Sequence, residues 1–300
     1  MTPGPRILLF GTTGQVGWEL RRALQPLGDV VAVSRAEADF DRPETLRALF
    51  AERPAVVVNA VAYTAVDQAE SDVERAMRVN GEAVAVLADE AKRCDALFVH
   101  YSTDYVFDGR KEGPYVESDP TAPQSSYGRS KRAGEEAIEA SGGDHLVLRT
   151  SWVFTSRGKN FLRTILRLAG ERESLRIVGD QFGAPTSARL IADVTAQVVA
   201  RALAERSAGA FKSGIYHLAA AGTTSWHGFA AYIVERARAA GWTPLVARTI
   251  DAIATAEYPV PAPRPANSRL DTSKLAERFG IAFPDWRTGV DLCIAELQDR

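Results

Sequence analysis

A glycine-rich turn near the N-terminus constrains the fold of this chain more than any other feature. Residues 7–10 (I-L-L-F) form an apolar run without alternation, typical of a strand buried on both faces of a parallel sheet. Gly11, Gly14 and Gly17 follow at equal spacing, and the apolar residues after them have helical spacing. At such a junction the free N–H groups and the positive helix end favour a phosphate. The turn therefore predicts the first unit of a dinucleotide-binding fold, although a tight turn that binds nothing would show the same spacing.

Short apolar runs followed by segments of helical spacing recur along the chain. We expect buried strands at 30–33, 55–59, 96–100 and 145–149, and helices at 43–52, 71–93 and 127–140. Repeated strand–helix units predict an α/β fold, a Rossmann-like doubly wound parallel sheet with a smaller C-terminal α/β substrate domain. We expect residues 1–152 and about 188–216 to form the dinucleotide-binding domain, and about 153–187 and 217–300 to form the substrate-binding domain.

The composition argues against nucleic acid and membranes as partners. The formal net charge of −2 gives no electrostatic reason to expect either, and no apolar run is long enough to cross a bilayer. Cys94 and Cys293 suggest no disulfide framework and fit a reducing cytoplasm. The four histidines lack metal-ligand spacing, so we expect no metal site. The sequence predicts a cytoplasmic protein and leaves monomer and homodimer open.

The end of the second predicted strand bears on the choice of cofactor. In a dinucleotide fold, an Asp or Glu here holds the ribose 2′-OH of NAD. This chain has Ser34 and Arg35 instead. A hydroxyl and a guanidinium suit a 2′-phosphate, so the pair favours NADPH and leaves NADH as the alternative. A solvated surface charge remains the other interpretation of Arg35.

Seven motifs are spread over nearly the whole chain. They are G-T-T-G-Q-V-G-W-E-L, V-N-A-V-A-Y-T-A-V-D, H-Y-S-T-D-Y-V-F-D-G, Y-G-R-S-K, R-T-S-W-V-F, D-Q-F-G-A-P-T and R-P-A-N-S-R-L. With them the chain resembles the family of dTDP-4-dehydrorhamnose reductases, within the extended short-chain dehydrogenase/reductases. The last three belong to the substrate half and separate this family from nucleotide-sugar epimerases and dehydratases. The resemblance implies reduction of the 4-keto group of dTDP-4-dehydro-β-L-rhamnose to dTDP-β-L-rhamnose, the last step of dTDP-rhamnose biosynthesis.

The Y-x-x-x-K motif supplies the chemistry that such a reduction needs. Tyr127 and Lys131 are four residues apart and share one face of a predicted helix. A nicotinamide must donate the hydride, since no side chain can. Tyr127 can donate the proton if its pKa, ordinarily about 10, is lowered, and the positive charge of Lys131 favours the phenolate. Thr103, at the end of a predicted central strand, can orient the substrate oxygen. We therefore expect Thr103, Tyr127 and Lys131 to be catalytic.

The resemblance and the strand ends also predict the binding residues. Asn80 is either a satisfied core amide or, as the resemblance implies, the asparagine that holds a water beside Lys131. Trp152 is either a sugar-packing wall or a core residue. Asn160 and Arg269 are the first candidates to bind the diphosphate and Arg264 is the next, and the alternative is that the two arginines lie in a surface linker. The expected cofactor contacts are Gly11, Thr13, Gly14, Gln15, Val16, Gly17, Ser34, Arg35, Asp39, Phe40, Ala60, Ala62, Tyr63, Thr64, Asn80, Tyr101, Tyr127 and Lys131. The expected contacts to the dTDP-sugar are Val66, Thr103, Asp104, Tyr105, Tyr127, Trp152, Asn160, Arg264 and Arg269.

One position departs from the family pattern. Some members are dimers joined through a metal held by acidic residues, and Glu19 fits that role. Arg189 stands where a further acid would be needed. A guanidinium cannot ligate a cation, so we expect no metal-bridged dimer.

Three alternative functions stay open at the level of sequence. The chain could act on another dTDP-4-keto-6-deoxysugar. It could be a non-catalytic, cofactor-binding regulator, like the related regulatory subunit of methionine adenosyltransferase. A purely structural interaction protein is the third alternative, but it would not need three glycines at a strand–helix turn.

Overall fold

A six-stranded parallel sheet forms the centre of the larger unit of the protein. The computed structural model describes residues 4–299; residues 1–3 and 300, at the ends of the two predicted domains, lie outside this description. The strand order is β10-β5-β4-β3-β1-β2, with every pairing parallel. The strands are β1 (Arg6–Phe10), β2 (Asp29–Ala32), β3 (Val56–Asn59), β4 (Leu97–Thr103), β5 (His145–Thr150) and β10 (Gly214–His217). The predicted doubly wound parallel sheet is confirmed.

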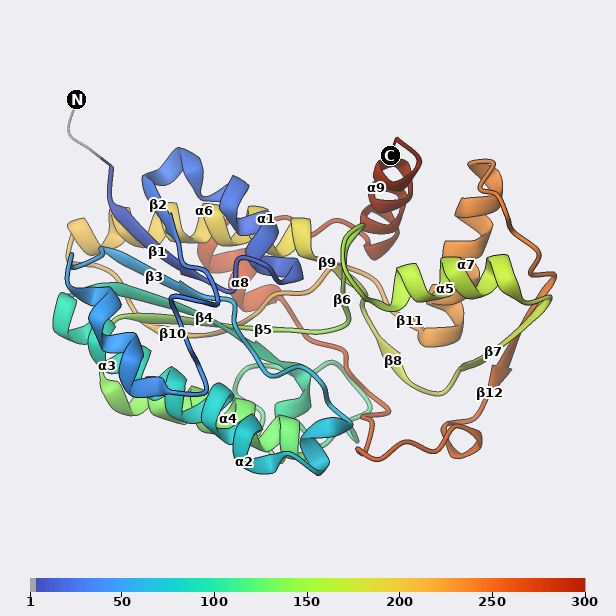
Figure 1. Cartoon of the computed structure of the whole chain (residues 1–300), viewed down its shortest axis with the longest axis horizontal. Coiled ribbons are helices and arrows are strands. Elements are labelled where there is room, and N and C mark those ends of the chain that lie inside the picture. Colours follow the sequence, from blue (N-terminus) through green and yellow to red (C-terminus); the bar gives the residue numbers. More distant parts are fainter. Residues whose placement is uncertain (1–3, 300) are drawn as a thin grey trace.

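Helices cover both faces of this sheet (Figure 1). One face carries α1 (Gln15–Ala23), α6 (Ala188–Ser207) and α8 (Ser273–Phe279), and the other carries α2 (Val73–Met77), α3 (Ala83–Cys94) and α4 (Ser126–Ser141). A separate apolar core fills each interface, so the inner strands β1, β3, β4 and β5 are buried on both sides, as their apolar runs predict. The expectation of a buried strand at 30–33 is wrong for most of β2, because this strand is at the edge of the sheet and its residues are exposed or half-buried. Leu275 and Phe279 of the late helix α8 belong to the core beneath α6.

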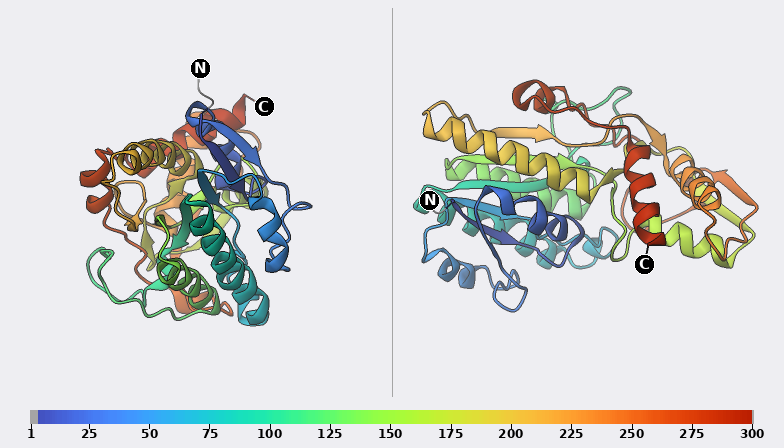
Figure 2. Two further views of the ribbon diagram at one scale, coloured as in Figure 1. Left: turned by 90° about the vertical axis from the view of Figure 1, so that its left-hand side faces the viewer. Right: turned by 90° about the horizontal axis from the view of Figure 1, so that it is seen from above.

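A smaller unit lies at the carboxyl end of the sheet (Figures 1 and 2). Its helices are α5 (Phe161–Glu171), α7 (Trp226–Ala239) and α9 (Trp286–Gln298), packed around Phe154, Phe229 and Trp286. Three strand pairs complete it: β6 (Val153–Phe154) with β9 (Thr186–Ser187), β7 (Ser174–Val178) with β12 (Thr249–Ile253), and β8 (Phe182–Gly183) with β11 (Thr224–Ser225). The boundaries of the two predicted domains stay a prediction.

Two predicted helices differ in detail from the structure. The segment at 71–93 is not one uniform α-helix, because a π-turn, η4 (Arg78–Glu82), separates α2 from α3. This wider turn carries Asn80, whose side chain bridges the Tyr63 backbone and the Ser130 hydroxyl. The segment at 43–52 is a 3₁₀ helix, η2 (Pro43–Phe50). Among residues 4–299, no helix combines the length and the apolar character needed to cross a bilayer.

Candidate active site

The glycine turn has the geometry of a dinucleotide cradle. Gly11 has φ 82°, and a Cβ there would lie 2.6 Å from the carbonyl carbon of Ala60, so only glycine fits. A Cβ on Gly17 would lie 2.1 Å from the Gly11 oxygen, so its absence lets α1 approach the turn closely. Gly14 is the N-cap of α1 and has no side chain to cover the first-turn N–H groups. These groups fit the pyrophosphate of a dinucleotide.

A cavity of about 790 Å³ opens beside this turn, large enough for a cofactor. It extends from the turn past the end of β2 to the end of β3. Its lining includes ten predicted cofactor residues: Gly11, Thr13, Gly14, Ser34, Arg35, Asp39, Phe40, Ala60, Ala62 and Tyr63. It also includes residues that the sequence did not indicate, among them Thr12, Arg42 and Arg75. The other predicted cofactor residues lie outside this lining: Gln15, Val16, Gly17, Thr64, Asn80, Tyr101, Tyr127 and Lys131.

Near the Ser34 end of the cavity, the exposed carboxylate of Glu37 folds back onto the chain. The backbone N–H of Ser34 donates to Glu37 Oε2 at 2.8 Å. The side chain and backbone of Ser34 both lower the pKa of Glu37 by hydrogen bonding. Nearby, Arg42 pairs with Asp39, and Arg75 forms a two-pronged pair with Asp41. Glu37 therefore occupies the Ser34 N–H and hydroxyl, which are the donors that suit a 2′-phosphate. The sequence did not indicate this contact.

Tyr127 and Lys131 project from the first two turns of α4. Ser125 caps this helix by accepting from the Gly128 N–H. Lys131 Nζ donates to the Tyr101 carbonyl oxygen at 2.7 Å and lies 3.0 Å from His100 Nε2. Burial is the main cause that lowers the pKa of Lys131, to about 8. The helix thus presents a buried amine that titrates near neutrality.

The pKa of Tyr127 is raised in the structure, whereas easier proton donation would need it lowered. Burial raises this pKa, and the charge of Asp104 adds to the effect. A hydrogen bond with Thr103 opposes the increase. Because desolvation of the phenolate dominates, the protein environment alone does not make this phenol more acidic.

Thr103 lies at the end of β4 and links Tyr127 to Asp104. Its Oγ1 donates to Asp104 Oδ1 at 2.9 Å and accepts from the Tyr105 N–H at 3.2 Å. Burial raises the pKa of Asp104 to about 6. The Thr103 hydroxyl hydrogen is directed to Asp104, so it would have to turn away from Asp104 to reach the Tyr127 oxygen or a substrate oxygen.

Two groups of aromatic side chains include predicted substrate residues. Val66 and Tyr105 share an apolar cluster with Tyr127, and the Tyr105 and Tyr127 rings meet edge to face at 5.5 Å. Trp152 has φ 49° and stacks on Trp226 with ring centroids 3.7 Å apart. A Cβ on Gly183 would lie 2.8 Å from the Trp152 ring, so this glycine makes room for the indole. The left-handed backbone and the stack hold Trp152 in one orientation.

The three predicted diphosphate ligands are already hydrogen-bonded elsewhere in the protein. Asn160 caps α5: it accepts from the Arg163 N–H and donates to the Thr155 and Arg157 carbonyl oxygens. Arg264 pairs with Asp67 at 2.6 Å. Arg269 donates to Asn267 Oδ1 and to the Glu112 carbonyl oxygen. A diphosphate contact from any of them would need these bonds to be exchanged.

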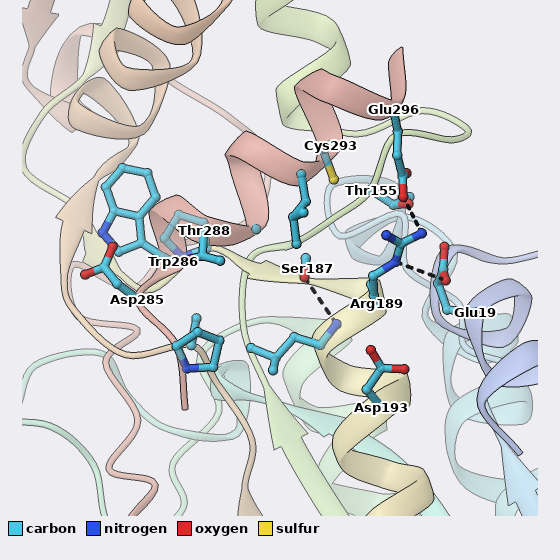
Figure 3. A pocket seen from close by; sticks show the side chains of 16 residues that line it. Glu19, Thr155, Ser187, Arg189, Asp193, Asp285, Trp286, Thr288, Cys293 and Glu296 are labelled. Carbon is cyan, nitrogen blue, oxygen red and sulfur yellow. Dashed lines mark hydrogen bonds and ion pairs between the residues drawn. The ribbon is translucent and has the colours of Figure 1, made fainter. Parts of the chain in front are cut away.

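A second pocket, of about 170 Å³, lies where α1, α6 and α9 meet (Figure 3). Arg189 projects into it between two carboxylates. It pairs with Glu296, and its Nε lies 3.9 Å from Glu19 Oε2. Within residues 4–299, no group of three His, Cys, Asp or Glu side chains has the arrangement of a metal site. The Arg189 guanidinium lies between the acids that could otherwise share a cation.

The comparisons with known proteins agree with this geometry. The family model described as "RmlD substrate binding domain" matches residues 5–299. The chain belongs to the RmlD family. A relative in Burkholderia thailandensis, named dTDP-4-dehydrorhamnose reductase, is 60% identical over 97% of this chain and 99% of its own length. Another in Escherichia coli K12, with the same name, is 48% identical over 97% of both chains.

Solved structures extend the comparison to the fold of the RmlD family. A Clostridium acetobutylicum dTDP-4-dehydrorhamnose reductase superposes with a TM-score of 0.87 at 32% identity, covering 98% of this chain and 99% of that one. The Bacillus anthracis reductase, solved in complex with NADP, has a TM-score of 0.87 at 29% identity and the same coverage. A UDP-glucose 4-epimerase, at 16% identity and a TM-score of 0.79, shares the fold. The chain therefore has the Rossmann-like fold of the extended short-chain reductases.

His100 and Asn59 are site residues that the sequence motifs did not indicate. Both are polar residues within otherwise apolar strands, and they are register partners on β4 and β3. His100 is fully buried beside Lys131. A polar side chain in a strand that is buried on both faces was the available signal, because it must find a hydrogen-bond partner.

Proposed function

We propose that this chain reduces the C4 keto group of dTDP-4-dehydro-β-L-rhamnose with NAD(P)H to give dTDP-β-L-rhamnose, the last step of dTDP-rhamnose biosynthesis. The observation that carries the proposal is the position of Tyr127 and Lys131 on α4, at the carboxyl end of a parallel sheet that also bears a dinucleotide cradle. The relative named dTDP-4-dehydrorhamnose reductase, which is 60% identical over 97% of this chain, supports the same substrate. We propose that the protein works in the cytoplasm, as a monomer or homodimer.

The proposed reaction divides the work between the cofactor and three side chains. A bound nicotinamide supplies the hydride. Tyr127 donates its phenolic proton to the C4 oxygen, where negative charge develops. Thr103 directs its hydroxyl hydrogen to Asp104 in the free protein, and with substrate bound we expect that hydrogen to turn to the C4 oxygen and orient it, so that the Tyr127 hydrogen stays available for transfer. Lys131 favours the phenolate while its Nζ is protonated.

The proposed site also accounts for the rest of the substrate. Trp152, held by its stack on Trp226, forms an apolar wall for the 6-deoxysugar. Val66 and Tyr105 pack beside Tyr127 and are the other proposed sugar contacts. Arg264 and Arg269 are the proposed diphosphate ligands, because both lie on the proline-rich segment that follows η6 (Thr255–Glu257). Asn160 is a weaker candidate, since its amide already caps α5.

Substrate profiling tests this function. The purified protein is incubated with NADPH and enzymatically prepared dTDP-4-dehydro-β-L-rhamnose, and the product is identified by NMR. Other dTDP-4-keto-6-deoxysugars serve as controls. Formation of dTDP-β-L-rhamnose as the preferred product supports the proposal. Preference for another 4-keto sugar would assign the chain to a sibling activity, and binding of NADPH without turnover of any sugar would indicate a regulatory protein.

A further inference from the structure

Asn59, His100 and Lys131 form a hydrogen-bonded row that crosses from the sheet to α4. Asn59 Nδ2 lies 3.2 Å from His100 Nδ1, and His100 Nε2 lies 3.0 Å from Lys131 Nζ. The exposed fraction is 0% for Asn59 and His100 and 1% for Lys131. Water therefore does not supply the missing partners, and the donors and acceptors must match within the row.

The backbone fixes the direction of every bond in this row. The N–H of Val61 donates to Asn59 Oδ1 at 3.0 Å, so the Asn59 amide must direct its NH₂ group at His100. An NH₂ group only donates, so His100 Nδ1 must accept and carries no hydrogen. Burial and the charge of Lys131 lower the pKa of His100 well below its usual value, so the ring is neutral. Its one hydrogen must then be on Nε2, directed at Lys131.

An N–H directed at a lysine has a consequence for the charge of that lysine. An unprotonated amine has a lone pair and can accept from His100 Nε2–H, while it donates to the Tyr101 carbonyl oxygen. An ammonium has three hydrogens and no lone pair. It could bind His100 only if the hydrogen moved to Nδ1, where it would face the NH₂ group of Asn59.

We propose that His100 is a positioning residue for Lys131: Asn59 holds the imidazole in its Nε2–H tautomer, and that N–H orients the Lys131 amine and opposes its protonation. This adds to the effect of burial, which lowers the pKa of Lys131 to about 8. Lys131 can therefore release and regain a proton at Nζ near neutral pH, whereas an ordinary lysine, with a pKa of about 10.4, stays charged.

Other charged groups near Lys131 do not replace this effect. On its own helix, Glu135 raises the pKa of Lys131, and it is held by a two-pronged pair with Arg149. From η5 (Asp104–Val106), Asp104 acts on Tyr127.

From η3 (Gln68–Glu70), Glu70 binds Ser126 at the start of α4, and Asn80 of η4 binds Ser130. On β4, the Tyr101 phenol bonds to Thr195 of α6. His100 is the group on β4 that meets Nζ through a titratable nitrogen.

NMR of the full chain purified without cofactor tests the inference directly. Long-range ¹H–¹⁵N spectra of histidine-labelled protein report which ring nitrogen of His100 carries hydrogen, and the signal is assigned by its loss in His100→Gln. We expect an Nε2–H tautomer with a bare Nδ1 at a pH above the Lys131 pKa, where the amine is unprotonated and can accept. Hydrogen on Nδ1, or a charged ring, would overturn the inference. This measurement needs only the wild-type fold, so it stands even if the variant is unstable.

Lysine-labelled protein then tests the effect on Lys131. The ¹³Cε signal of Lys131, assigned by its loss in Lys131→Gln, is titrated in wild type, in His100→Gln and in the control His217→Gln. His217 is another buried histidine, and it bonds to the Asp271 carbonyl oxygen away from Lys131. A glutamine at position 100 can present its carbonyl oxygen to an ammonium. We therefore expect the Lys131 pKa to rise by about one unit in His100→Gln and to stay unchanged in the control. An unchanged pKa in His100→Gln would contradict the proposal.

The consequence for turnover rests on the proposed function. The Lys131 charge that favours the Tyr127 phenolate is present below the Lys131 pKa and is lost as the pH rises through it. kcat should therefore fall on the basic side of neutrality, and in His100→Gln this fall should move to higher pH by the shift that NMR measures. If the decrease of kcat at high pH does not occur at the Lys131 pKa that NMR measures, Lys131 does not have this role in turnover. The tautomer remains measurable even if the protein reduces no keto sugar, so the two failures are distinguishable.

Discussion

Arg189 of α6 forms an ion pair with Glu296 of α9, and this contact joins the sheet-bearing unit to the smaller unit. Its Nε also lies 3.9 Å from Glu19 on α1, the helix that follows the glycine turn. A guanidinium is a permanent cation with donors only, so it can hold two carboxylates together without a metal. The three helices are connected by side chains of this chain alone.

Turnover should therefore be independent of divalent metal. We expect wild-type kcat to be unchanged after exhaustive dialysis against EDTA, and Mg²⁺ should not raise the melting temperature. In Arg189→Glu, three carboxylates would meet in this pocket. That variant should be less stable without metal and should gain a melting-temperature increase with Mg²⁺. Loss of wild-type activity in EDTA, restored by Mg²⁺, would show that a metal acts here despite Arg189.

Arg35→Ala should reduce the preference for NADPH over NADH. The guanidinium lines the cofactor cavity at the end of β2, where a 2′-phosphate would lie. A hydrogen bond to a charged group contributes about 1.5–3 kcal/mol, so the NADPH/NADH ratio of kcat/KM should fall roughly tenfold or more. Arg172→Ala, at an exposed arginine of the smaller unit, is the control. An unchanged ratio in Arg35→Ala would make Arg35 a surface charge.

Glu37→Gln should have the opposite effect. The Glu37 carboxylate accepts from the Ser34 N–H at 2.8 Å and repels any phosphate that approaches the same donors. Removing this charge should raise the NADPH/NADH ratio of kcat/KM on the order of tenfold, because the contact that is freed for the 2′-phosphate is again a hydrogen bond to a charged group. Glu44→Gln, which removes an exposed acid that does not bind Ser34, should leave the ratio unchanged. A lower ratio in Glu37→Gln would mean that Glu37 supports the bound phosphate indirectly.

Local sequence could predict the cofactor half of the site but not its buried polar contacts. The glycine turn, Tyr127 and Lys131 are short-range patterns, because a turn or one helix face fixes their geometry. The Asn59–His100–Lys131 row depends on strand register and on helix packing between residues 31 and 41 positions apart. The stack of Trp152 on Trp226 likewise joins distant segments. The raised pKa of Tyr127 could not be predicted, because the spacing indicates a neighbouring charge but not the depth of burial.

Arg269→Ala should weaken binding of the nucleotide sugar and not of the cofactor. If this guanidinium exchanges its bonds to Asn267 and Glu112 for the diphosphate, its loss should cost about 2–5 kcal/mol in substrate binding. The expected result is a strongly raised KM for the dTDP-sugar with an unchanged Kd for NADPH, measured beside the exposed control Arg248→Ala. Normal substrate binding in Arg269→Ala would leave Arg264 as the candidate.

The central claim is that Tyr127 delivers the proton in reduction of the C4 keto group. The most direct test is single-turnover formation of dTDP-β-L-rhamnose by wild type and by Tyr127→Phe, with NADPH binding measured on both proteins. Because the phenol acts only in the transition state, kcat should fall roughly 10²–10⁴-fold while the NADPH Kd stays nearly constant. A Tyr127→Phe protein that forms dTDP-β-L-rhamnose at a near-normal rate would contradict the account.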